Sequence, residues 1–291
     1  MNTAVYANAI RGLIRGRLLV VAVALALIFC MLQAMAIANE RHMLRQERDQ
    51  VATAARTGAV PMTGSGKSKL TADMYLDALR ADSAAALREE ALHYETLFLV
   101  FMSLFALGAV FGRESAHGGL DRVLTAPVSG PAAAASLLGA TFVFTQSCIT
   151  VLFMFLEFRL HVFSAAPAIA VYKYAMLTAM HCMILSLSFL CHVLFGRNTA
   201  FAASAALVFL GFASYAIHIA GGEMASPALR AAAHAYTFAM PQMGTLFFEA
   251  LNRVRPGVFP KAGVNAWWYI FEAFRTAVIL GAGLYLFNKK N

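Results

Sequence analysis

The chain has 291 residues, of which 60% are hydrophobic and only 13% are Asp, Glu, Lys or Arg. A soluble globular domain carries about 25% charged residues, so this chain has too little charge to solvate the surface of a soluble protein. Its net charge of +8 is spread over the segments between apolar runs, which excludes the dense basic face of a nucleic-acid-binding protein. All four cysteines lie inside apolar runs, so no disulfide framework is indicated.

The apolar residues form six runs that are each long enough to cross a bilayer. A spanning helix needs about 20 predominantly apolar residues. The predicted spans are residues 18–39, 93–112, 131–156, 171–195, 199–221 and 265–288. The first run is long enough to span the membrane and is not followed by the small-residue cleavage site of a signal peptide. We therefore expect it to stay in the mature protein. The fold class predicted is an all-α, polytopic membrane protein.

Residues 1–17 have the pattern of a helix that lies on a membrane surface. Tyr6, Ile10 and Leu13 share one sector of the helical wheel, and Arg11 lies opposite them. The segment is predicted to be a cytoplasmic interfacial elbow helix that turns into the first span. The alternative is that the first span simply begins early.

Six spans place both termini on one side of the membrane. Lys and Arg are denser in the segments on that side than in the longer segments opposite. By the positive-inside rule, both termini are expected in the cytoplasm, and we expect the protein in the bacterial cytoplasmic (inner) membrane.

Two long segments lie on the other, extracytoplasmic side. Residues 40–92 are predicted to form a helical hairpin, in which a Gly- and Pro-containing tip at 57–68 separates two helices and Ser83 caps the second one. In residues 222–263, proline breaks the semi-apolar stretches into pieces too short to span. These pieces are predicted to be re-entrant or interfacial helices.

Charged and polar residues inside the spans are candidates for special roles, because they are costly to bury there. Glu272 and Arg275 are three residues apart on one face of the last span, which predicts an intramembrane ion pair. Lining a transport path is the alternative. Glu157 is expected, together with Arg159, only to mark the membrane interface at the end of the third span. Lys173 is taken as an edge residue.

The fourth span gathers histidine and cysteine, but they are too far apart along one helix to share a metal ion. Its four residues are His181, Cys182, Cys191 and His192. Eleven residues separate the two histidines, which is about 16 Å along a helix axis. Polar packing between helices is predicted for each of them, with a pathway role as the alternative. No metal site is predicted in this chain.

The segment 113–130 is unlike an ordinary loop. It reads GRESAHGGLDRVLTAPVSG from residue 112 on, with a glutamate and a Gly-Gly pair before a short leucine-containing stretch and a Pro-Val-Ser step. This pattern resembles the signature loop of ABC-2 type transporter permeases, nearest to those of the nitrous-oxide-reductase maturation and gliding-motility group. Six spans, the elbow helix and the broken outer segment fit the resemblance. The long segment 40–92 departs from the polysaccharide-exporting branch.

The resemblance implies that the segment 113–130 is a coupling loop, whose helix docks on a separate ATPase subunit. The residues expected to bind that partner are Glu114, Gly118, Gly119, Leu120, Asp121, Arg122, Val123, Leu124 and Pro127. The Gly-Gly pair would allow a sharp change of direction and the proline would end the helix. A GSGKS string at 64–68 lacks the earlier glycine of a phosphate-binding loop.

The chain is therefore expected to have no catalytic residues and no cofactor of its own. ATP and Mg²⁺ would bind on two partner ATPase subunits, and a second permease copy, identical or not, would complete the membrane part. Membrane lipid and an extracytoplasmic protein are the other expected partners. The expected function is export of a substrate, or force transmission to the outer partner. The alternative is a membrane scaffold whose hairpin binds a partner without transport; a secondary transporter is disfavoured because inverted repeats with broken spans are not evident.

Overall fold

The computed structural model describes residues 2–56, 72–116, 129–160, 166–195, 197–223, 226–260 and 264–290. Within these ranges the chain is all α-helical and forms nine helices. Six of them are long and apolar enough to cross a membrane, namely those containing Arg17–Thr53, Met74–Phe111, Gly130–Leu160, Pro167–Leu194, Thr199–Gly221 and Ala266–Lys289. The predicted fold class of a polytopic helical membrane protein is confirmed.

The N-terminal elbow is a separate helix, α1 (Thr3–Arg15). The side chain of Asn2 caps it by accepting from the amides of Ala4 and Val5. At Gly16 the backbone becomes extended, and the chain turns into α2 (Arg17–Arg56). The apolar face of α1 packs on α5 and α2, with Leu13 buried. This arrangement matches the amphipathic pattern that the sequence predicts.

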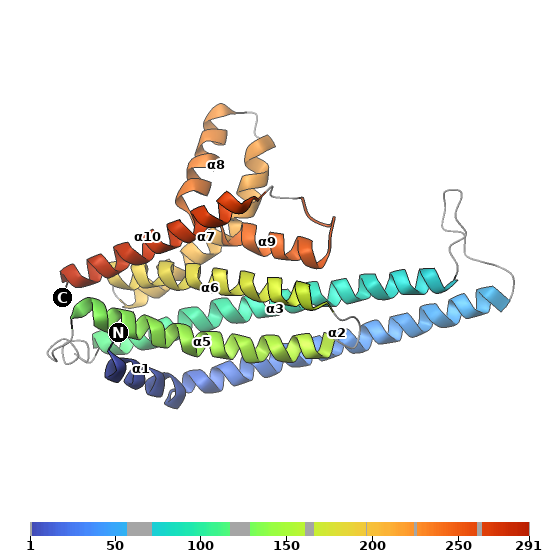
Figure 1. Cartoon of the computed structure of the whole chain (residues 1–291), viewed down its shortest axis with the longest axis horizontal. Coiled ribbons are helices and arrows are strands. Elements are labelled where there is room, and N and C mark those ends of the chain that lie inside the picture. The colour runs from blue at the N-terminus through green and yellow to red at the C-terminus, as the bar shows by residue number, and fades with distance from the viewer. Residues whose placement is uncertain are drawn as a thin grey trace.

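The second helix, α2, and the third, α3 (Ala72–Ala116), form a long antiparallel hairpin that extends beyond the other helices (Figure 1). They contain 40 and 45 residues, or about 60 and 68 Å of helix, against about 30 Å of hydrocarbon core. The expectation that Ser83 begins a helix is wrong, because α3 runs through it without a break and buries its side chain. The surplus length makes the hairpin protrude. We call this end of the molecule the hairpin end.

Helix α3 is the centre of the bundle. It packs against α2, α5 (Gly130–Leu160), α6 (Pro167–Leu194), α7 (Arg197–Glu223) and α9 (Met243–Val254). Phe98, Leu99, Met102 and Leu107 on α3 are at most 1% exposed. The last helix, α10 (Ala266–Lys290), packs on α6 and α5. Both chain termini lie together at the end opposite the hairpin (Figure 1), which we call the termini end.

The segment between the fifth and sixth spans folds as two short helices, α8 (Pro227–Ala239) and α9. Helices α7 and α8 pack against each other and stand across the long axis of the bundle (Figure 1). Helix α9 turns back along that axis and buries one face against α7, α6 and α3. The two short helices thus occupy the predicted place of the re-entrant or interfacial pieces.

Candidate functional site

The predicted coupling loop lies almost entirely outside the described residues. Gly118, Gly119, Leu120, Asp121, Arg122, Val123, Leu124 and Pro127 all fall in the undescribed range 117–128. Glu114 belongs to the last turn of α3, where only the backbone is described. The helices on either side are clear, because α3 ends at Ala116 and α5 begins at Gly130. Both of these ends lie at the termini end of the molecule (Figure 1).

The first polar site in the described residues is a buried break between α8 and α9. The chain is extended at Met240, and Pro241 and Gln242 lead into α9. Gln242 is 7% exposed. A helix that ends in a buried place leaves backbone carbonyls without intrahelical donors, and these need partners from elsewhere.

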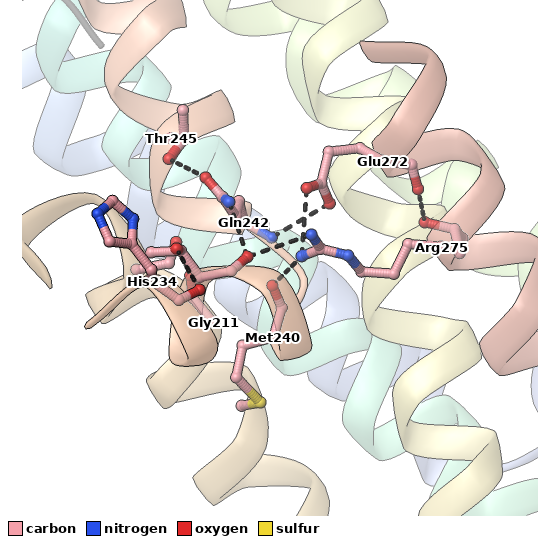
Figure 2. A network of polar contacts seen from close by, with 10 residues as sticks. Gly211, His234, Met240, Gln242, Thr245, Glu272 and Arg275 are labelled. Carbon is pink, nitrogen blue, oxygen red and sulfur yellow. Dashed lines mark hydrogen bonds and ion pairs between the residues drawn. The ribbon is translucent and has the colours of Figure 1, made fainter. Parts of the chain in front are cut away.

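Arg275 of α10 supplies the donors that the end of α8 requires. Its guanidinium donates to the carbonyl oxygens of Met240 and Thr237, at 3.1 Å for Thr237 (Figure 2). The Gln242 side chain donates to the same Thr237 carbonyl at 2.8 Å. A planar guanidinium with several fixed donors suits two carbonyls at once. The sixth span is thereby bound to the break.

Glu272 completes this network. Its carboxylate lies 3.2 Å from the Arg275 guanidinium and accepts a hydrogen bond from the backbone amide of Gln242 at 3.3 Å (Figure 2). Glu272 is 2% exposed and Arg275 is 8% exposed. The two residues that the sequence singled out do come together. Both residues lie on α10, and their hydrogen bonds to the α8–α9 break join α10 to that break.

Close backbone contact between α7 and α9 fixes the break from its other side. A Cβ atom placed on Gly244 would lie 2.1 Å from the carbonyl oxygen of Phe212 on α7. A Cβ atom on Gly211 would lie 3.1 Å from the carbonyl oxygen of Pro241. Only glycine permits the approach at position 244, and the contact at position 211 is tight. Gly211 thus packs against the α8–α9 break within the chain.

A second buried site consists of Glu95 on α3, Glu157 on α5 and Lys173 on α6, which sequence reasoning missed. The Lys173 ammonium lies 2.5 Å from a Glu157 oxygen and 3.3 Å from a Glu95 oxygen. The side chains of Lys173 and Glu95 are 0% exposed, and that of Glu157 is 17% exposed. Lys173 lies near the start of its span, as expected, but it is buried and paired, and Glu157 does more than mark an interface. One ammonium links three helices.

Part of this triad has a signal in the sequence. Glu157 lies three residues before the end of α5, and Lys173 lies six residues after the start of α6. A short connection between antiparallel helices brings such positions together. Glu95 has no comparable signal, because nothing in its own neighbourhood relates it to residues 157 and 173. Arg159, expected with Glu157 at the interface, instead donates to the Cys30 carbonyl at 2.8 Å.

A third polar link joins α9 to the hairpin. Arg255, just after α9, contacts Asp82 at 3.2 Å and Glu89 at 3.3 Å on α3. The hydrogen bond to Glu89 raises the pKa of the Arg255 guanidinium above its usual value. Its partners are partly exposed, so this link lies at the surface. It ties the end of α9 to the base of the hairpin.

The histidines of the fourth span do not come together. His181 Nδ1 bonds the Gln146 side chain at 2.7 Å, whereas His192 Nδ1 bonds the Ser188 carbonyl at 2.8 Å. In the part of the chain that the structure describes, there is no group of three or more His, Cys, Asp or Glu side chains that could hold a metal ion. Each histidine has its own separate surroundings.

No protein-family model matches the chain, and a search among curated proteins finds no match. The described residues form a helical membrane protein with six candidate spans, whose helices are joined by polar contacts centred on Lys173, Arg255 and Arg275.

Proposed function

We propose that this chain is the membrane-spanning permease subunit of an ABC transporter. Two permease copies would work with two separate ATPase subunits, which bind ATP and Mg²⁺ and hydrolyse the nucleotide. The permease itself is then no enzyme. Its task is to convert ATPase closure into export of a substrate or into force on an extracytoplasmic partner.

The observation that carries this proposal is the common position of three features at the termini end. The amphipathic helix α1, the end of α3 and the start of α5 all lie there, together with the C-terminus (Figure 1). A partner on that side of the membrane can therefore reach the segment 113–130. Basic residues are denser in the sequence on that side, which supports a cytoplasmic position in a bacterial inner membrane.

Helix α3 offers a mechanical path from that segment to the opposite side. It is continuous from Ala72 to Ala116 and packs on six other helices, α1 among them. A displacement of its termini end is carried along the rigid helix toward the hairpin end. Lys173 and Arg255 tie the same helix to α5, α6 and the end of α9. Movement of α3 would therefore act on the third and fourth spans as well.

Association with an ATPase tests the proposal. The chain is co-expressed with an ATPase encoded next to its gene, and the complex is isolated through a tag on the permease. Leu120→Asp combined with charge reversal at Asp121 and Arg122 should abolish both association and stimulated ATP hydrolysis. Charge reversal at the exposed Arg45 of the hairpin, the matched control, should leave both unchanged. Retention of association and stimulation in the triple variant would refute the proposal.

The protruding hairpin specifically favours a second candidate, a membrane scaffold that binds an extracytoplasmic protein without transport. The length of α2 and α3 beyond membrane thickness supports it. Deletion of residues 57–68 separates the candidates. A scaffold loses its outer partner and shows no dependence on any ATPase, whereas a permease keeps its ATPase stimulation after the deletion.

A further inference from the structure

A polar cluster lies at the middle of α5 and α6, apart from the three links described above. It consists of Gln146 and Thr150 on α5 and Tyr174, Thr178 and His181 on α6. Gln146 and His181 lie near the midpoints of their helices, and therefore near the middle of the two candidate spans. Polar groups at this depth need hydrogen-bond partners, because lipid offers none.

The two threonines fix the direction of the hydrogen bonds. Thr178 donates its hydroxyl proton to the Tyr174 carbonyl at 2.9 Å, and Thr150 donates its own to the Gln146 carbonyl at 2.7 Å. A hydroxyl has one proton. Toward the rest of the cluster, both threonines can therefore only accept.

The remaining assignments follow from this. The Gln146 amide nitrogen donates to Thr178 at 3.0 Å and to the Tyr174 hydroxyl at 2.9 Å, which uses both of its protons. The Tyr174 hydroxyl then donates to Thr150 at 2.7 Å. The Gln146 amide oxygen is left facing His181, so His181 Nδ1 carries a proton and donates at 2.7 Å.

His181 Nε2 is the open position of the cluster. It is buried and has no hydrogen-bond partner among the described residues, and the His181 residue is 0% exposed. A second proton on Nε2 would be an unpaired donor in a buried place, which is costly. With the proton on Nδ1, Nε2 is an acceptor. Phe142 stacks on the ring at 4.8 Å between centroids and fixes its plane.

The donor count decides what this cluster can bind. Every N–H and O–H of the five side chains is used inside the cluster, and the unused capacity consists of acceptor lone pairs, foremost that of His181 Nε2. We propose that the cluster is a binding site for a neutral solute that donates hydrogen bonds through hydroxyl or amide groups. An anion finds no donor there, and a cation finds no carboxylate in the cluster.

The cluster also has an edge toward the outside of the chain. Gln146, Thr150, Tyr174 and Thr178 are half-buried, whereas His181 is fully buried behind them. The half-buried threonines give a solute accessible acceptors, and His181 Nε2 is a further acceptor in the interior. The link of this site to transport rests on the proposed function, whereas binding itself is measured without any ATPase.

Histidine nitrogen resonances test the site directly. The purified chain, labelled with ¹⁵N-histidine in lipid nanodiscs, is titrated with benzyl alcohol, toluene or benzoate; empty nanodiscs correct for partitioning into lipid. We expect an unprotonated Nε2 signal that disappears in His181→Phe. Benzyl alcohol should shift this signal saturably, while toluene, which lacks the hydroxyl, and anionic benzoate should not.

His192 provides the matched control, because its Nε2 is also buried without a partner but lies outside the cluster. His192→Phe should leave the response to benzyl alcohol unchanged. A proton found on Nε2 instead of Nδ1 would overturn the donor count. An equal shift with toluene, or no shift with saturating benzyl alcohol, would overturn the binding site.

A second pair of variants keeps the inference testable if His181→Phe fails to fold. Thr178→Val removes an acceptor and frees one Gln146 N–H, so the variant should gain a measurable response to benzoate; Thr178→Ser should behave as the wild type. Equal responses of the two variants would contradict the assignment. The two proposals fail separately. A chain that binds no ATPase but shows the Nε2 response would refute the permease function and support the binding site. A chain that binds the ATPase but shows no Nε2 response would support the permease function and refute the binding site.

Discussion

Replacement of Lys173 by methionine should be among the most destabilising single changes in the described part of the protein. The ammonium lies 2.5 Å from Glu157 and 3.3 Å from Glu95, and its removal leaves two carboxylates facing each other without a counter-charge. Removal of one partner from a buried ion pair costs about 3–5 kcal/mol. We expect Lys173→Met to fall in that range, measured as the free energy of unfolding in mixed micelles titrated with SDS.

The exposure of the two carboxylates predicts an asymmetric rescue. In Lys173→Met with Glu95→Gln, the remaining Glu157 has a 17% exposed side chain and can reach water. In Lys173→Met with Glu157→Gln, the remaining Glu95 is 0% exposed and keeps its desolvation cost. The first double variant should recover more than half of the lost stability, and the second should recover little.

Two results would refute this reasoning. One is equal stability of the two double variants, which would mean that burial does not distinguish the carboxylates. The other is a loss below about 1 kcal/mol in Lys173→Met, the range of an exposed salt bridge. Lys289→Met, at an exposed position on α10, serves as the matched control and should leave the free energy of unfolding unchanged.

Three further predictions can be tested in the same unfolding assay. Gly244→Ala should lose about 1–3 kcal/mol by overpacking, because its Cβ would lie 2.1 Å from a carbonyl oxygen of α7; Gly281→Ala, which has open space around it, should gain up to about 1 kcal/mol, and equal effects would contradict the close approach. Arg275→Met should cost about 3–5 kcal/mol, and adding Glu272→Gln should return only part of it, since the carbonyls of the α8 end stay unpaired; full recovery would show that only the charge pair matters. Arg255→Gln should cost no more than about 1 kcal/mol because its ion pairs are partly exposed, and a larger loss would mean that this link is stronger than its exposure implies.

The sequence predicts the helices well because membrane thickness imposes a length and a composition on each span. Each of the six predicted runs coincides with a helix of the structure, and two of them extend one residue past the helix end. The elbow appears because its apolar and basic residues separate on a helical wheel. Helix ends were less predictable outside the membrane. Ser83 resembles an N-cap in its local sequence. The helix α3 nevertheless continues through it from Ala72, and the Ser83 side chain is buried by packing.

The buried polar contact that was predicted is the one whose two partners lie on one helix. Glu272 and Arg275 are neighbours in sequence, and their spacing alone places them on one face. The bonds of Arg275 to the α8–α9 break depend on how the chain returns after Pro241, which no local pattern encodes. Lys173 joins residues 78 and 16 positions away, so its role required the packing of three helices.

The distribution of ion pairs along α3 bears on how the helix can move. Glu95 binds Lys173 in a buried ion pair, and Asp82 and Glu89 add a weaker, partly exposed link to Arg255, so α3 is held by charge mainly at Glu95. From Phe98 to Leu107 the buried side chains are mainly apolar. Between helices in a bilayer, apolar contacts gain no hydrophobic advantage over contacts with lipid tails, whereas a buried ion pair loses several kcal/mol when it separates. A force applied near Ala116 should therefore tilt α3 about the region of Glu95, and its termini end should move farther than its charged half.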